Sequence, residues 1–214
     1  MSNRVNIGCG KTPTNGWINM DNSLAIKLAN SPLKYKIART LGLLNAEQIE
    51  NIEWNKLNKI KFADATKTLP LKDSSVECIY ASHMFEHLPK NGAKIFLKEA
   101  KRVLKSGGIL RLAVPDLKIA IEEYLKSRDA DSFMERILVE PPPISSLKQK
   151  LILLITGYRH HQWMYDGVSL SKLFKEIGFN EVEICKSGYT KIHNPDELNL
   201  NEHEDYSVYV EGVK

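Results

Sequence analysis

A glycine-bearing stretch near the amino terminus most constrains how this chain can fold. Residues 4–21 read Arg-Val-Asn-Ile-Gly-Cys-Gly-Lys-Thr-Pro-Thr-Asn-Gly-Trp-Ile-Asn-Met-Asp. Val5 and Ile7 are β-branched and suit a buried strand, while Gly8 and Gly10 let the backbone turn and approach a ligand closely. A turn of this kind at the carboxyl end of a parallel strand is where α/β sheets hold nucleotides. The stretch therefore predicts an α/β fold with a nucleotide-binding turn.

Glycine spacing argues against two common nucleotide motifs. The dinucleotide fingerprint G-x-G-x-x-G needs a third glycine, but Gly8-Cys9-Gly10 is followed by Lys11-Thr12-Pro13. A phosphate loop would match at Gly10-Lys11-Thr12, yet its first position falls on Val5, inside the expected strand. Nucleoside-triphosphate hydrolysis is therefore disfavoured, and a nicotinamide-dependent oxidoreductase remains an alternative.

A third motif fits better, because Asn6 to Gly10 resembles motif I of the class I methyltransferases that use S-adenosylmethionine. That motif has an acidic residue, an apolar residue and then G-x-G-x-G; here Asn6 replaces the acid and Thr12 the third glycine. Further segments agree with the type 11-like members in the family's order: Asp21 after the next apolar run, Phe62-Ala63-Asp64-Ala65, the segment 69–88 ending in Glu86-His87-Leu88, and 102–110 with Gly107-Gly108.

This resemblance implies a fold, a cofactor and a binding site. The fold is Rossmann-like and doubly wound, with a mostly parallel seven-stranded sheet, an antiparallel last strand and helical insertions. The cofactor is S-adenosylmethionine. In the family, the acid corresponding to Asp21 binds the ribose, since a carboxylate can accept from both hydroxyls, and the acid corresponding to Asp64 binds the adenine amine. The cofactor-binding residues implied are Asn6, Gly8, Cys9, Gly10, Asp21, Asp64, Ala65 and Ser82.

The chain of 214 residues with 43% apolar content is expected to form one domain, residues 1–214. Only ten residues separate Gly10 from Asp21, and they include Pro13 and Asn15-Gly16, so the first crossover helix is expected to be reduced to a turn. Two helical insertions are expected to compensate. Residues 24–58 would cover the cofactor side, and residues 116–168 would roof the substrate pocket.

The first insertion has apolar residues at helical spacing, interrupted by Ser31-Pro32, which predicts two short helices followed by a third over 45–55. We expect these helices to pack on their own core, although a basic amphipathic segment can also lie on an acidic lipid surface. Later elements are expected as helices over 91–105, capped by Asn91, and over 117–127, 130–138, 146–156 and 167–177, and as strands over 109–114, 182–185 and 206–210.

The strand over 76–81 is followed by His83, Glu86 and His87, which form an H-x-x-E-H pattern. The same spacing occurs in inverted zinc proteases, but we expect no metal here because the pattern lies inside the methyltransferase resemblance and no distant acidic third ligand is evident. Either His87 caps or packs against the following turn, or His83 faces the transferable methyl group and Ser82 lines the cofactor pocket. We take His83 as the first candidate for a general base and His161 as the second.

Residues 157–166, Gly-Tyr-Arg-His-His-Gln-Trp-Met-Tyr-Asp, are rich in aromatic and polar rings. Rings with a flat apolar face and a polar tip suit sugars, so His160, Trp163 and Tyr165 are candidate substrate-binding residues. This region and the chain's ending also resemble a methyltransferase subgroup associated with surface-polysaccharide synthesis. The resemblance implies O-methylation of a sugar hydroxyl on a nucleotide-linked or lipid-linked glycan. A non-catalytic module that only binds S-adenosylmethionine is a further alternative.

Composition limits the partners. The net charge of +4 is too small to argue for nucleic acid, and Cys9, Cys78 and Cys185 lack metal-type spacing, which favours a reducing compartment. The longest apolar run, 151–155, is too short to cross a bilayer. We therefore expect a cytoplasmic enzyme with a small-molecule or glycan substrate, in possible peripheral contact with a membrane-linked glycan; the sequence does not give an oligomeric state.

Overall fold

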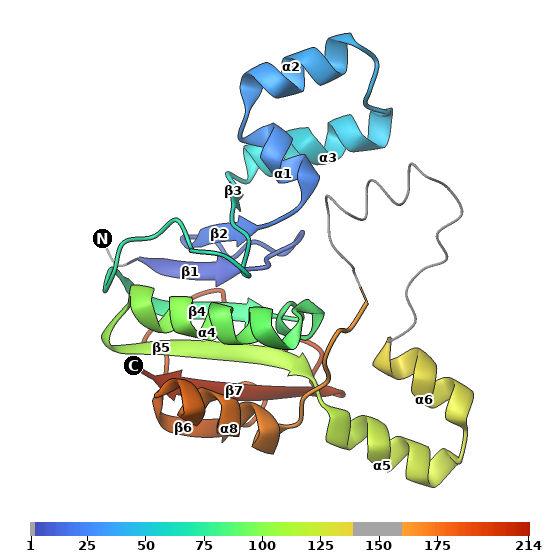
Figure 1. Ribbon diagram of the computed structural model, residues 1–214, viewed down its shortest axis with the longest axis vertical. Coiled ribbons are helices and arrows are strands. Elements are labelled where there is room, and N and C mark those ends of the chain that lie inside the picture. The colour runs from blue at the N-terminus through green and yellow to red at the C-terminus, as the bar shows by residue number, and fades with distance from the viewer. Residues whose placement is uncertain (1–2, 139–159) are drawn as a thin grey trace.

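The computed structural model describes residues 3–138 and 160–214 and contains one seven-stranded sheet (Figure 1). The strand order is β3-β2-β1-β4-β5-β7-β6, and β7 runs antiparallel to both of its neighbours while the other pairs are parallel. The strands are β1 (Arg4–Ile7), β2 (Ile18–Asp21), β3 (Lys61–Phe62), β4 (Val76–Ser82), β5 (Leu104–Pro115), β6 (Asn180–Cys185) and β7 (Ser207–Val213). The Rossmann-like fold predicted above is confirmed.

The helices follow the predicted order. They are α1 (Leu24–Ala29), α2 (Pro32–Thr40), α3 (Ala46–Leu57), the short 3-10 helix η1 (Phe85–His87), α4 (Lys90–Val103), α5 (Leu117–Ser127), α6 (Ala130–Ile137) and α8 (Gly167–Ile177). The helix expected over 146–156 lies outside the described residues. Several boundaries differ from the prediction: β6 begins two residues earlier, β7 ends three residues later, and α4 ends two residues earlier. Helix α4 begins after Pro89 rather than at an Asn91 cap, and β5 begins at Leu104, because this buried leucine already pairs with Val76 of β4.

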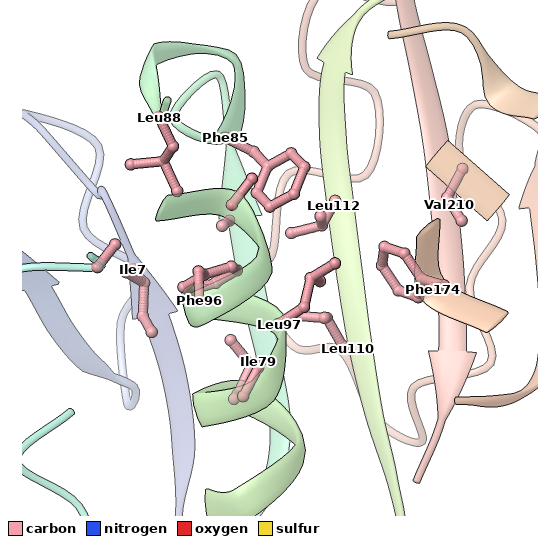
Figure 2. Close-up of a cluster of buried hydrophobic side chains, with 14 of the residues drawn as sticks. Ile7, Ile79, Phe85, Leu88, Phe96, Leu97, Leu110, Leu112, Phe174 and Val210 are labelled. Carbon is pink, nitrogen blue, oxygen red and sulfur yellow. The ribbon is translucent and has the colours of Figure 1, made fainter. Parts of the chain in front are cut away.

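Strand alternation explains how the sheet is covered. Successive side chains of a strand point to opposite faces of the sheet. On one face, apolar side chains from all the central strands together form the main core. Helices α4 and α8 pack on this face, where Phe96, Leu97 and Phe174 contact the sheet in the main core (Figure 2). The sheet residues of this core are Val5, Ile7, Ile79, Ala81, Leu110, Leu112, Val114, Val208 and Val210.

The opposite face of the central strands is covered by the connection between β6 and β7, residues 186–206, which we call the β6–β7 loop. Tyr80 of β4 packs there with Ile192 and Leu198 of the loop. Arg111 of β5 and Glu211 of β7 are fully buried on this face and form an ion pair at 2.8 Å. Arg111 also donates to the loop carbonyls of residues 189 and 200, so the charged pair ties the loop to the sheet.

The absence of a first crossover helix is confirmed, since residues 8–17 connect β1 to β2 by turns alone. The insertion that follows contains three helices, as expected, and projects beyond the β2–β3 edge of the sheet (Figure 1). Ile26 of α1 and Trp54 of α3 pack against Cys9 of the glycine turn. Helix α2 differs from the expectation of self-packing, because most of its apolar residues are exposed: Leu33 and Ile37, with Leu41 and Leu43 just beyond. Within the described residues, no helix is both long and apolar enough to span a membrane.

Candidate functional site

The glycine turn leaves β1 at its carboxyl end and is fixed by the neighbouring strand. The backbone N–H groups of Gly8 and Cys9 both donate to the Met20 carbonyl of β2, at 2.8 and 3.2 Å. Gly8 (φ +75°) and Gly10 (φ +50°) adopt the left-handed conformation that favours glycine. The Cys9 side chain is buried, and burial raises the pKa of its thiol to about 12. Cys9 is therefore a packing residue of the turn and not a thiolate at neutral pH.

Gly8 is the tightest position in this turn. A Cβ at Gly8 would lie 2.5 Å from Cγ of Met84, whereas a Cβ at Gly16, which has the same φ of +75°, would meet nothing within 4 Å. We expect Gly8→Ala to lower the free energy of unfolding by about 1–3 kcal/mol more than Gly16→Ala. Both substitutions strain the backbone, but only the Cβ at Gly8 would overlap with Met84. Urea denaturation of the two variants measures the difference. Equal losses would show that Met84 moves aside freely.

Asn6 has a role that sequence reasoning missed. It was predicted to bind the cofactor, but its side chain is buried and its amide donates to the Thr12 carbonyl and to Oγ1 of Thr14, at 3.3 and 3.1 Å. Asn19 of β2 completes the arrangement, accepting from Thr14 N–H and donating to the Thr14 carbonyl. Two buried asparagines thus hold the shortened connection, taking over the positioning task of the missing helix.

Asp21 ends β2 directly beside the glycine turn. Its Oδ2 accepts from Gly10 N–H at 3.1 Å, and its Oδ1 accepts from Ser23 N–H at 2.9 Å. Each carboxylate oxygen can accept more than one hydrogen bond, so both oxygens keep capacity for a diol. The carboxylate is half-buried and held in place by these two backbone groups.

Asp64 follows β3, the strand next to β2. Its Oδ1 accepts from the backbone N–H and hydroxyl of Thr66, and its Oδ2 lies 3.1 Å from the Lys67 ammonium. Burial acts to raise the pKa of Asp64, but the hydrogen bonds from Thr66 and Lys67 outweigh it and the pKa is lowered. Ala65 is buried in the main core. Asp64 is therefore an ionised hydrogen-bond acceptor directly after β3, the strand that pairs with the strand ending in Asp21.

The end of β4 places His83 in an unusual backbone conformation. His83 has φ +47°, its Nε2 lies 2.9 Å from the hydroxyl of Ser207, and its ring meets the rings of His203 and Tyr206 edge-on at 4.5 and 5.6 Å. Burial, followed by the proximity of other histidines, lowers the pKa of His83 to about 4, so the ring is neutral at physiological pH. Ser82, the residue before it, is half-buried. The neighbours from the β6–β7 loop were not foreseen from the sequence.

Glu86, the acid of the H-x-x-E-H pattern, lies at the centre of a histidine cluster. Its side chain is 1% exposed, and three histidine nitrogens surround its Oε1: His83 Nδ1 at 3.6 Å, His87 Nε2 at 3.8 Å and His161 Nε2 at 3.9 Å. Burial raises the pKa of the Glu86 carboxyl to about 8. The H-x-x-E-H spacing indicated three members of this cluster, His83, Glu86 and His87. The fourth member, His161, comes from the second insertion.

The segment 160–165 contains the other predicted residues, while residues 157–159 lie outside the described residues. His161 is buried, and its Nδ1 lies 2.9 Å from the Ile137 carbonyl; His160, beside it, is half-buried. Trp163 is 44% exposed, with the Lys90 ammonium 4.6 Å from its ring centroid. Tyr165 is placed in the main core against Phe85, at 5.1 Å between ring centroids. Of the predicted sugar-binding rings, Trp163 alone is well exposed.

Comparison with known proteins decides the family. The sequence model for a methyltransferase domain matches residues 5–112, which include the glycine turn, Asp21, Asp64 and His83. The chain belongs to this methyltransferase family. As a member, it is an enzyme that uses S-adenosylmethionine as its methyl donor. Among curated proteins, none matches the sequence.

Solved structures agree with the fold of this methyltransferase. A methyltransferase from Thermotoga maritima, described as a possible histamine N-methyltransferase, is 20% identical with a TM-score of 0.50; the match covers 100% of this chain and 83% of that one. The methyltransferase domain of the citrinin polyketide synthase is 12% identical with a TM-score of 0.50, over 99% and 46% of the two chains. Phosphoethanolamine N-methyltransferase 2 of Haemonchus contortus, in complex with S-adenosyl-L-methionine, is 10% identical with a TM-score of 0.49, over 100% and 48%.

Proposed function

We propose that this methyltransferase O-methylates a hydroxyl group of a sugar in a nucleotide-linked or lipid-linked glycan. The observation that carries the proposal is a neutral imidazole, His83, held at the carboxyl end of β4 by Ser207. A hydroxyl acceptor must lose its proton when it attacks the methyl group, and an imidazole within hydrogen-bond reach is suited to accept it.

The donor half of the site is formed by the glycine turn and two acids. Asp21 is proposed to bind the ribose hydroxyls, and Asp64 the adenine amine, each through oxygens already oriented by backbone donors. When bound, S-adenosylmethionine supplies a methyl group on a positively charged sulfur, which is already electrophilic. The protein therefore has to align the acceptor oxygen with the methyl carbon and exclude water, which is catalysis chiefly by orientation.

His83 is favoured over His161 as the base. The Nδ1 of His161 bonds the Ile137 carbonyl and its side chain is 5% exposed, whereas that of His83 is 19% exposed. The acceptor side also offers the exposed indole of Trp163, beside the ammonium of Lys90. A flat ring next to a cation suits a sugar that carries a phosphate or a carboxylate.

Helix α2 supports a membrane-linked acceptor as one form of this substrate. Leu33, Ile37 and Leu41 are exposed, with Lys34, Lys36 and Arg39 between them in the sequence. Leucines beside basic residues are the pattern of segments that lie at an anionic lipid surface. The helix would hold the enzyme close to a glycan whose lipid carrier is embedded in the membrane.

A methyl-transfer assay tests the substrate class. The enzyme is incubated with methyl-labelled S-adenosylmethionine and, separately, nucleotide sugars, lipid-linked sugars in anionic vesicles, and small amines. Label in a sugar product whose mass rises by one methylene supports the proposal, and a vesicle requirement identifies the lipid-linked form. Label in the amines alone overturns it in favour of N-methylation.

Asp21→Ala tests the donor half independently of the acceptor. Loss of a charged acceptor for the ribose hydroxyls should weaken binding of S-adenosylhomocysteine by about 10- to 100-fold, since hydrogen bonds to charged groups contribute roughly 1.5–3 kcal/mol. Isothermal titration calorimetry measures the change. Asp73→Ala is the matched control, because Asp73 is an exposed surface partner of Arg102.

The same titration separates the alternative functions. An oxidoreductase would bind NAD in preference to S-adenosylhomocysteine, and the Asp21 variant would then lose NAD affinity. If the two aspartate variants bind S-adenosylhomocysteine equally well, Asp21 does not hold the ribose.

A further inference from the structure

Three side chains from distant parts of the sequence converge on one buried point. Glu86 and His87 lie in η1, after β4, and His161 lies in the second insertion. One donor atom from each lies within 4.8 Å of the other two. We propose that Glu86, His87 and His161 form a binding site for a divalent transition metal, with Zn²⁺ as the best-fitting ion.

The first argument is that the Glu86 carboxyl group is buried without a hydrogen-bond partner among the described residues. Neither of its oxygens has a hydrogen-bond partner among the described residues, although the side chain is 1% exposed. Buried carboxylates are normally hydrogen-bonded, paired with a cation or bound to a metal, because burying the bare charge is very costly. The nearest basic side-chain nitrogens to Glu86 Oε1 among the described residues belong to His83, His87 and His161, at 3.6, 3.8 and 3.9 Å, so none of the three is within hydrogen-bond distance.

The second argument is the orientation of the two histidines. His87 Nδ1 lies 3.1 Å from the His160 carbonyl, and His161 Nδ1 lies 2.9 Å from the Ile137 carbonyl. A carbonyl only accepts, so Nδ1 must carry the proton in both rings. Nε2 is then the ring nitrogen of each histidine that faces Glu86 and can bind a metal. Metal-binding histidines characteristically donate their other N–H to a backbone carbonyl in this way.

The distances between the two histidine Nε2 atoms and Glu86 Oε1 fit a bound ion better than a direct hydrogen bond. The two Nε2 atoms are 3.8 and 3.9 Å from Glu86 Oε1, which is too long for a hydrogen bond. In a tetrahedral zinc site with bonds of about 2.0–2.2 Å, neighbouring donor atoms are about 3.4 Å apart. The Nε2–Oε1 distances would have to shorten by about half an ångström to reach this spacing, and the widest separation within the 4.8 Å group by up to about 1.4 Å. Two imidazoles and one carboxylate are a donor set found for zinc, with a fourth position left open.

The backbone already holds the ligands in place. Gln162 and Trp163 donate their N–H groups to the Glu86 carbonyl at 2.8 and 3.2 Å, and the Gln162 side chain donates to the His87 carbonyl at 2.8 Å. The ion would lock the segment 160–163, and with it Trp163, against the end of β4. The expectation of no metal depended on the place of the pattern inside the methyltransferase resemblance and on the lack of a distant acidic third ligand; the third ligand proposed here is a histidine, His161.

Zinc titration of the untagged, chelator-treated protein tests the site. Calorimetry with ZnCl₂ should give one high-affinity ion per chain, and the melting temperature should rise by about 5–10 °C when free zinc is 100-fold above the dissociation constant. Glu86→Gln and His161→Ala should each lose at least 100-fold in zinc affinity. His193→Ala, which removes an exposed histidine outside the cluster, should bind like the wild type.

Anomalous diffraction from wild-type crystals soaked in ZnCl₂ tests the site even if a variant does not fold. An anomalous peak bonded to Glu86, His87 and His161 supports the site. Peaks only elsewhere, or unchanged zinc affinity in folded Glu86→Gln and His161→Ala, overturn it. A preference for Fe²⁺ or Mn²⁺ over Zn²⁺ in competition keeps the ligands and overturns the choice of metal.

Discussion

His83→Ala should slow methyl transfer to a hydroxyl acceptor by about 10²–10⁴-fold, the usual contribution of a positioned general base. The loss should be in kcat, because His83 is proposed to act on the acceptor's proton and not to bind the donor. Binding of S-adenosylhomocysteine should remain within about twofold of the wild type. This prediction presupposes the sugar acceptor proposed above and is measured with that acceptor by steady-state kinetics.

Two controls separate proton transfer from simple damage to the site. His193→Ala removes an exposed histidine and should leave kcat unchanged. Because His83 has a positive φ, replacement by alanine also alters a strained backbone position; His83→Asn, which tolerates that conformation well but is no base, should therefore be as slow as the alanine variant. A kcat within threefold of the wild type in both variants would remove His83 from the chemistry and leave His161 or an acceptor that needs no base.

The sheet could be predicted from sequence because its signals are local. Val5 and Ile7 before the glycines, Asp21 after a short apolar run and Gly107-Gly108 in the turn to β5 each depend on neighbours within a few residues. The missing first helix was also predictable, because ten residues with a proline leave no room for one.

Side-chain contacts between distant residues could not be predicted. The partners of Asn6, which was predicted to bind the cofactor, are Thr12 and Thr14 of the same connection, and only the folded turn brings them together. Tyr165, which was predicted to bind substrate, packs against Phe85 in the main core. The coverage of one sheet face by the β6–β7 loop had no sequence signal. Its anchor, Arg111, lies in the stretch 109–115 of β5, where every other residue is apolar.

Arg111→Met should lower the free energy of unfolding by about 3–5 kcal/mol, the cost of leaving a buried partner charge uncompensated. Glu211, the partner, is fully buried and accepts from Lys191 N–H and from the hydroxyl of Thr190 as well. Denaturant unfolding measures the loss. Lys105→Met is the matched control in the same strand, because its ion pair with Glu77 is half-exposed at both ends and should contribute less than about 1 kcal/mol.

The double variant Arg111→Met, Glu211→Gln should recover more than half of the stability lost by Arg111→Met. An amide removes the buried charge and can still accept from Lys191 N–H, whereas the single variant retains a carboxylate with no cation. The β6–β7 loop contains His203 and Tyr206, whose rings contact His83, so kcat should fall in Arg111→Met and return in part with the double variant. A single variant as stable as Lys105→Met would mean that the loop is held by its apolar contacts, Ile192 and Leu198, and that the charged pair is dispensable.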